Sequence, residues 1–153
     1  MLFLIFELGR DRYAIDVRQI AEVLPLVAVT RVAGAPKGMD GLFNYRGAPV
    51  PLVDLAQVTL GRPSARRLST RIVLVYYPDD AGRSHLLGLV AERATRTASH
   101  EPSEFVPSGI TSTAAPYLGG IATDAQGLLQ RMDIATLLPP SFRDLLFKAP
   151  AGH

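Results

Sequence analysis

Few side chains in this sequence have the types and spacing that catalysis requires. The histidines His85, His100 and His153 form neither an i, i+4 pair nor the HExxH pattern of a helical zinc site. Cysteine is absent, which excludes thiolate metal sites, disulfides and cysteine nucleophiles. We therefore expect no metal, no cofactor and no catalytic residue, and we interpret the histidines as surface or partly buried side chains.

One hydrolytic alternative stays open, in which folding brings Asp54, His85 and Glu92 together. The adjacent Ser84 and His85 do not support it, because no GxSxG turn is present to expose a serine nucleophile. Neither a Walker A loop nor a GxGxxG turn follows an apolar run, so nucleotide binding has no support. A hydrolase would need a concave pocket that holds the three groups, and we expect none.

Clustered arginines raise a second alternative, a module that binds nucleic acid. They form two groups, Arg62, Arg66, Arg67 and Arg71, and Arg93 with Arg96. Phosphate binding usually needs a basic stripe with interleaved aromatic residues, but no aromatic residue follows the first group until Tyr76, and the net charge is only +2. We interpret the first group as a solvated linker and keep nucleic acid as the alternative partner.

The composition is that of a globular protein with a true core. Of the 153 residues, 48% are hydrophobic and 20% are charged, which is far from the composition of disordered chains. The apolar run at residues 2–6 is too short for a signal peptide and meets Glu7 at once. The uncharged stretch 105–123 contains prolines and glycines, so it cannot form a lipid-facing helix. We expect a soluble cytoplasmic protein whose membrane association is only indirect.

Short apolar runs separated by turns predict an all-β fold. The runs are residues 2–8, 13–17, 22–32, 41–45, 49–53, 72–77 and 85–91. Gly9-Arg10-Asp11-Arg12 and Arg46-Gly47 have the residue types of hairpin turns. Only residues 54–60, 133–138 and 141–147 suggest short helices.

The chain also repeats itself. Residues 41–42 recur as 120–121 and residues 53–55 as 132–134, both 79 positions later, whereas residues 13–15 recur as 87–89, which is 74 positions later. In each half an aspartate, Asp54 or Asp133, stands where a helix N-cap is expected, because its carboxylate can accept the unpaired backbone N–H groups. The order of elements is therefore the same in both halves.

Each half has about five short strands, which suits a small closed barrel without exposed edges. We divide the chain into a first barrel subdomain at residues 1–61, a linker at 62–70, a second barrel subdomain at 71–140, and a short C-terminal helix and tail at 141–153. Exchange of strands between the two subdomains stays open. The irregular stretch 99–116 is expected to form a long loop of the second half.

The most distinctive segment is MDGLFNYRGAPVPLVDL at residues 39–55, a strand, an Arg-Gly turn, a proline-flanked strand and an Asp-Leu cap. It resembles the signature of the CheW family of chemotaxis coupling proteins. Four further segments are similar to that family's pattern: YAIDV at 13–17, IAEVL at 20–24, YLGGIA at 117–122 and LLQRMDI at 128–134. The resemblance spans residues 2–138.

This resemblance implies a scaffold of two SH3-like five-stranded β-barrels without catalytic activity. It implies a chemosensory adaptor that couples chemoreceptors, the methyl-accepting chemotaxis proteins, to a CheA-type histidine kinase. The expected partners are the regulatory domain of the kinase and the cytoplasmic tips of the receptors, and the expected location is the cytoplasm at receptor arrays. Kinase binding is expected at strand edges of the barrels, with micromolar affinity of about −8 kcal/mol.

The candidate binding residues lie around the Arg-Gly turn. Arg46 carries a guanidinium fork that can clamp a carboxylate, and the resemblance places Glu22 beside it as an ion-pair partner. Asn44 and Gly47 belong to the same turn and are candidate partner contacts, as is Ile121, which also fits a core position. Arg46 could alternatively be a solvated turn residue.

Overall fold

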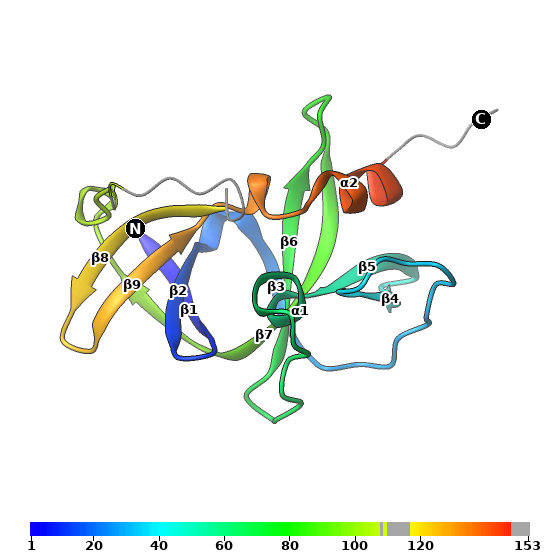
Figure 1. Cartoon of the computed structure of the whole chain (residues 1–153), viewed down its shortest axis with the longest axis horizontal. Helices are drawn as coiled ribbons and strands as arrows, with labels where there is room; N and C mark the ends of the chain where they lie inside the picture. Colours follow the sequence, from blue (N-terminus) through cyan, green and yellow to red (C-terminus); the bar gives the residue numbers. More distant parts are fainter. Residues whose placement is uncertain (108, 110–116, 148–153) are drawn as a thin grey trace.

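A computed structural model of the chain describes residues 1–107, 109 and 117–147, and β-strands dominate it (Figure 1). The strands are β1 Leu2–Leu8, β2 Asp11–Asp16, β3 Ile20–Pro25, β4 Met39–Tyr45, β5 Ala48–Asp54, β6 Arg71–Pro78, β7 Ser84–Ser99, β8 Leu118–Asp124 and β9 Gly127–Met132. The helices are α1 Leu55–Leu60 and α2 Pro140–Phe147, with 3-10 turns η1 Val17–Gln19, η2 Pro102–Glu104 and η3 Ile134–Thr136. His153, the end of the predicted tail and most of residues 108–116 of the predicted loop lie outside the described residues.

The strands form two groups of five that lie side by side, on the left and right of Figure 1. The first, called the β1 barrel, contains β1, β2, β8, β9 and the later part of β7. The second, called the β4 barrel, contains β3, β4, β5, β6 and the earlier part of β7. The all-β prediction of two five-stranded barrels is confirmed, and β7 is the strand that both share.

The strand pairing differs from the predicted division into residues 1–61 and 71–140. The hairpin β1–β2 does not pair with β4–β5 of its own half; β2 runs parallel to β9, with Arg12 opposite Leu129. In the same way β5 runs parallel to β7, with Leu52 opposite Gly88. Each barrel therefore takes strands from both halves of the sequence. Parallel pairing between strands that are distant in the chain leaves no local pattern in the sequence. The subdomain boundary at residues 62–70 was therefore predicted from turn residues alone.

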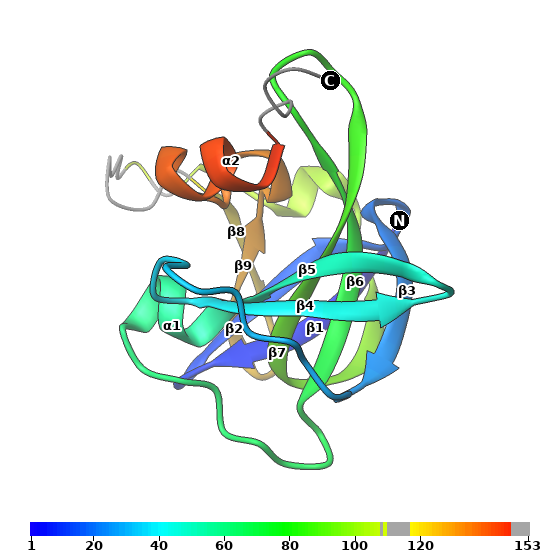
Figure 2. The same ribbon diagram turned by 90° about the vertical axis from the view of Figure 1, so that its right-hand side faces the viewer.

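The pairing registers confirm the internal repeat. In the β1 barrel Leu4 lies opposite Ile15, and at the repeat-related positions of the β4 barrel Val73 lies opposite Leu89. Two isolated bridges, Thr30 to Leu42 and Val106 to Ile121, also occupy equivalent places. The two barrels are thus built on one backbone plan, seen from a second direction in Figure 2.

Two glycines of the repeat, Gly41 and Gly120, stand where a crossing segment approaches the backbone. A Cβ atom on Gly41, whose φ is +139°, would lie 2.2 Å from the carbonyl oxygen of Thr30. A Cβ atom on Gly120 would lie 2.8 Å from the carbonyl carbon of Phe105. Both positions therefore need glycine for the same reason, which is the close passage of the segment that closes each barrel.

Three clusters of apolar side chains form the core. Each barrel has its own interior, which contains Phe43 and Leu74 in the β4 barrel and Phe3 and Leu129 in the β1 barrel. The largest cluster draws on β1, β2, β6 and β7 and on the C-terminal segment, which contributes the buried Phe142 of α2. The central core therefore joins the two barrels and the C-terminal helix into one packed unit.

Two strands differ in length from their predicted ranges. The run at residues 22–32 forms a strand only as far as Pro25, since proline has no N–H group to continue a ladder. The run at residues 85–91 continues to Ser99, because the mostly polar residues after Glu92 pair with β1, and among them only Ala94 is fully buried. Among the described residues, no helix is long and apolar enough to cross a membrane.

Candidate partner-binding site

The Arg46-Gly47 turn joins β4 to β5 as a two-residue hairpin loop, since Tyr45 pairs with Ala48. Arg46 has φ +50° and Gly47 has φ +88°, and positive φ at both central residues is typical of the type I′ turn. The side-chain oxygen of Asn44 accepts a hydrogen bond from the backbone N–H of Gly47 at 2.8 Å. The turn is therefore held in one conformation by its own strand.

The side chain of Arg46 projects from this turn toward β3. One guanidinium nitrogen lies 3.2 Å from a carboxylate oxygen of Glu22, and the guanidinium also stacks 5.1 Å from the ring centre of Tyr45. The Arg46 side chain is 75% exposed and that of Glu22 is 35% exposed. The charged groups of Arg46 and Glu22 are therefore accessible to a partner protein. We call Glu22, Asn44, Tyr45, Arg46 and Gly47 the Arg46 surface.

Ile121 lies elsewhere. It belongs to β8 in the β1 barrel, where it is half-buried, pairs with Gln130 and bridges to Val106. Its repeat-related counterpart in the β4 barrel is Leu42, which bridges to Thr30 in the same way. The structure thus brings Glu22, Asn44, Arg46 and Gly47 together and leaves Ile121 on the other barrel.

The two aspartates of the repeat head helical turns. Asp54 is 1% exposed and precedes α1, and its carboxylate accepts hydrogen bonds from the backbone N–H groups of Ala56 at 3.1 Å and Gln57 at 3.5 Å. Asp133 precedes η3 and accepts one from the N–H of Ala135 at 3.0 Å. A buried carboxylate needs such donors, so these hydrogen bonds give Asp54 a structural role as a helix cap.

The junction at residues 62–70 is bonded to the barrels, which corrects the interpretation of a solvated linker. The buried Ser64 donates its backbone N–H to Asp54 at 2.9 Å. Arg62 pairs with Glu92 at 3.1 Å, and Arg66 pairs with Asp40 at 2.8 Å. These bonds could not be predicted from the sequence, because each partner of the junction residues lies on an element that is distant in the chain. Among the arginines of residues 62–70, Arg67 alone has no ion pair with a described residue.

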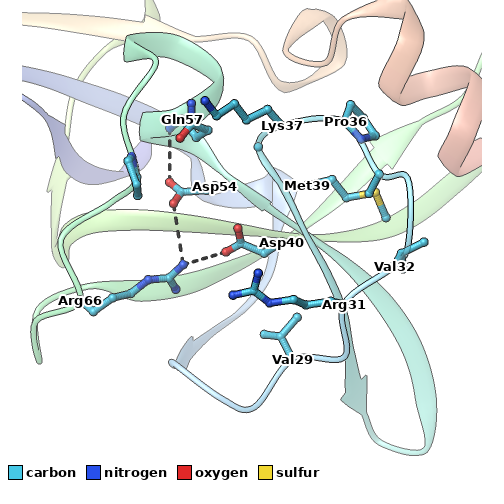
Figure 3. Close-up of a pocket in the computed structure, with 13 residues that line it drawn as sticks. Val29, Arg31, Val32, Pro36, Lys37, Met39, Asp40, Asp54, Gln57 and Arg66 are labelled. Carbon is cyan, nitrogen blue, oxygen red and sulfur yellow. Dashed lines mark hydrogen bonds and ion pairs between the residues drawn. The ribbon is translucent and has the colours of Figure 1, made fainter.

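A hollow of about 670 Å³ opens beside Asp54, between the segment 29–40 and the junction (Figure 3). In Figure 3 the guanidinium of Arg66 points at Asp40 and Asp54, and Arg31 and Lys37 stand along the opposite wall. The two carboxylates in the hollow are therefore already compensated by Arg66. The hollow contains none of the histidines that acid–base chemistry would use.

The hydrolytic alternative is not supported, because its three residues have separate partners. Asp54 caps α1, Glu92 accepts hydrogen bonds from Arg62 and from the backbone of Ala65, and His85 lies 2.7 Å from Asp79 in the β6–β7 hairpin. The hydrogen bond from His85 lowers the pKa of Asp79 below its ordinary value. No three His, Asp or Glu side chains of the described part of the chain form a group that could hold a metal ion.

The sequence analysis missed an ion pair between the two hairpins of the β1 barrel. The Arg12 guanidinium donates to both carboxylate oxygens of Asp124, at 2.5 and 3.0 Å, and this hydrogen bonding lowers the pKa of Asp124. The repeat could have indicated it, because Asp124 is the counterpart of Tyr45 and Arg12 that of Leu86. The equivalent positions carry a charged contact in the β1 barrel and side chains that pack against the apolar interior in the β4 barrel.

A comparison of the sequence with known protein families shows which family the chain belongs to. The CheW-like domain family matches residues 2–140, which is nearly the whole chain. The chain belongs to the CheW-like domain family. The expected resemblance, with its all-β fold of two SH3-like barrels, is thereby confirmed.

Individual relatives agree with this membership in the CheW-like family. The chemotaxis protein CheW of Klebsiella aerogenes is 29% identical over 153 residues, which is 99% of this chain and 89% of the relative. The chemotaxis protein CheW of Treponema pallidum is 26% identical over 140 residues, 86% of this chain and 78% of the relative. The crystal structure of the scaffolding protein TtCheW from Thermoanaerobacter tengcongensis shares the fold, with a TM-score of 0.78, 20% identity, and coverage of 92% of this chain and 89% of that one.

Proposed function

We propose that this protein is an adaptor that couples methyl-accepting chemotaxis proteins to a CheA-type histidine kinase in a chemosensory array. The observation that carries the proposal is the match of residues 2–140 to the CheW-like domain family, together with relatives that are chemotaxis proteins of that name. The partners are the regulatory domain of the kinase and the cytoplasmic tip of the receptor. The protein then works by binding alone, without catalysis and without a cofactor.

The Arg46 surface is the proposed contact for the kinase, with Ile121 as a further contact on the β1 barrel. Three features support this choice: Arg46 is largely exposed, its turn is fixed by Asn44, and its ion pair with Glu22 is accessible to solvent. A fixed turn loses little conformational entropy on binding, and an arginine that stacks on a tyrosine is typical of binding hot spots. The neighbouring strand β4 also gives an edge to which a partner can pair.

The same proposal assigns the protein to the cytoplasm at receptor arrays. Its attachment to the membrane is then indirect, through the receptors that it binds. A component that assembles and exchanges has little use for very tight contacts, so a micromolar dissociation constant, which is a binding free energy of about −8 kcal/mol, suits the role.

Reconstitution with purified components tests the proposal. A CheA-type kinase and a receptor signalling fragment from the same organism are mixed with this protein, and kinase autophosphorylation is measured. We expect receptor-dependent stimulation that is lost with Arg46→Glu and kept with Arg83→Glu, an exposed arginine on the β6–β7 hairpin that serves as the matched control. Stimulation that does not require the protein, or no complex with either partner, contradicts the proposal.

A further inference from the structure

A second charged surface lies on the β1 barrel, on the opposite barrel from the Arg46 surface. A hollow of about 740 Å³ is lined by β1, the β1–β2 turn, β7 and β9. A smaller hollow of about 240 Å³ shares the lining residues Glu7, Ser69 and Arg93 with it, so the two hollows adjoin. We call the combined feature the arginine groove, after its six cations, which are Arg10, Arg12, Arg62, Arg67, Arg93 and Arg96.

Positive charge is concentrated in this groove. The six arginines face three lining carboxylates, those of Glu7, Asp11 and Glu92. Arg12 is also bonded to Asp124, so an excess of two positive charges remains. The net charge of the whole chain is +2, so the rest of the molecule carries no formal net charge. A concave surface lined by one sign of charge focuses the electrostatic potential, which favours ligands of the opposite sign.

Half of these arginines are not engaged in ion pairs. Arg62 pairs with Glu92 and Arg93 pairs with Glu7, whereas Arg12 is bonded to Asp124. The remaining three are exposed and form no ion pair with a residue that the structure describes: Arg10, Arg67 and Arg96. Their guanidinium donors are therefore available to a carboxylate from outside.

At two positions of the groove, the repeat shows that the barrel fold does not require an arginine. At the position equivalent to Arg96, the β4 barrel has Glu22, and at the position equivalent to Arg12 it has Leu86. Leu86 packs against the interior of its barrel, so the same backbone plan is stable with an apolar side chain there. The charge of the groove is therefore a property of this surface and not of the barrel.

We propose that the arginine groove binds an acidic peptide segment of a partner protein. The carboxylates of Glu7 and Asp11 interrupt the cations, which disfavours a continuous phosphate backbone but suits a peptide whose acidic residues are spaced apart. The aromatic side chain that lines the groove, Phe6, is buried and cannot stack on a base. Leu128, 61% exposed beside the groove, adds an apolar contact for a peptide side chain. This proposal stands apart from the coupling function, because neither Ile121 nor any residue of the Arg46 surface lines the groove.

The test uses the full chain and a fluorescent peptide of alternating glutamate and serine, with binding followed by fluorescence anisotropy at low salt. The matched probe has glutamine in place of glutamate, and a thymidine oligonucleotide of similar length represents nucleic acid. The groove variant is Arg10→Glu with Arg96→Glu. The control variant is Arg31→Glu with Arg83→Glu, which changes the net charge equally at exposed arginines outside the groove.

We expect the glutamate peptide to bind in preference to both other probes, with affinity falling as salt rises. The groove variant should weaken binding by at least about tenfold, whereas the control variant should change it by less than about twofold. Equal losses in the two variants would mean long-range attraction without a site and would overturn the proposal. Tighter binding of the oligonucleotide, or no binding of the glutamate peptide, would overturn it as well.

Discussion

The ion pair between Glu22 and Arg46 is a surface contact whose role is in binding more than in folding. The nitrogen–oxygen distance is 3.2 Å and the Arg46 side chain is 75% exposed, so solvent screens the attraction. Exposed pairs of this kind contribute about 0.2–1 kcal/mol to folding. The stacking of Arg46 on Tyr45 adds a comparable small contribution and fixes the direction of the side chain.

We predict that Arg46→Ala folds normally and binds the kinase poorly. Its free energy of unfolding should change by less than about 1 kcal/mol, because the pair is exposed. A double-mutant cycle with Glu22→Ala, measured by urea denaturation and by kinase binding, separates the two effects. Loss of folding stability without loss of binding, or zero coupling energy in both measurements, would contradict a shared role for the two residues.

The bonded pair of Arg12 and Asp124 makes stability depend on pH. Hydrogen bonds from Arg12 lower the pKa of Asp124 in the folded state, so the folded protein binds a proton at this group less readily than the unfolded chain does. The stabilisation is therefore complete above the unfolded pKa of about 3.9 and is lost as the pH falls through the lower folded pKa.

We predict that Asp124→Asn is less stable than the unmodified protein at neutral pH and that the difference shrinks in acid. Urea denaturation at about pH 7 and about pH 3 measures it, since the stabilisation should be complete at the higher value and reduced at the lower one. Asp11→Asn is the control, because that exposed carboxylate has no ion pair with a described residue. A difference that stays constant across this range would show that ionisation of Asp124 does not contribute.

At the scale of elements, the equivalent glycines and aspartates define how each barrel is closed. The segment 26–30 crosses over Gly41, and the segment around Phe105 crosses over Gly120, so each crossing requires a residue without a side chain. After the hairpin that follows, Asp54 or Asp133 begins a helical turn. These are the residues by which the repeat is recognisable in the sequence.

We predict that Gly41→Ala destabilises the fold far more than Gly82→Ala. Both glycines have positive φ, which costs alanine about 1–2 kcal/mol. Only at Gly41 does the added Cβ also collide with backbone, at 2.2 Å from the oxygen of Thr30, whereas nothing lies within 4 Å of it at Gly82. The total loss at Gly41 should therefore reach about 3 kcal/mol or more, measured by urea denaturation. Equal losses of stability in the two variants would mean that the segment 26–30 moves to accommodate the added Cβ atom at little cost.

The junction at residues 62–70 also contributes to folding stability. The hydroxyl of Ser64 donates a 2.5 Å hydrogen bond to the buried carboxylate of Asp54. Ser64→Ala should cost about 1–3 kcal/mol, because a buried charged acceptor loses a donor. Ser103→Ala, at an exposed position of η2, is the control and should change stability little. An unchanged unfolding midpoint for Ser64→Ala would mean that this hydrogen bond of the junction does not contribute to folding stability.

At the scale of the whole molecule, the sequence predicted which segments form strands better than it predicted which strands pair. The run at residues 2–8 became β1 without change, and the positions of Gly41 and Asp54 revealed the repeat. The extension of β7 to Ser99 was missed because its polar residues give no apolar alternation. The pairing of β2 with β9 was missed because parallel contacts between distant strands depend on tertiary packing, which local patterns do not carry.

The same distinction applies to the candidate site. Asn44, Arg46 and Gly47 were found because they share one turn, and Glu22 was found through the family resemblance. The bond between Ser64 and Asp54 joins a residue of the irregular junction to the last residue of β5, so no spacing rule could have indicated it. The arginine groove gathers side chains from the β1–β2 turn, the junction and β7, and it exists only once the strands have been exchanged between the halves.

The exchange of strands predicts that neither half of the chain folds alone. Cutting the chain after Leu68, an exposed junction residue, would give fragments 1–68 and 69–153, which separate β1–β2 from β8–β9 and β4–β5 from β6–β7. Each fragment alone would expose half of the central core, so we expect no cooperative thermal transition in circular dichroism for either one. Mixing them should restore the strand signal and a transition whose midpoint rises with concentration, because folding then requires association. Cooperative unfolding of fragment 1–68 alone would contradict the exchanged arrangement, since that fragment lacks β7, the strand against which both β1 and β5 pair.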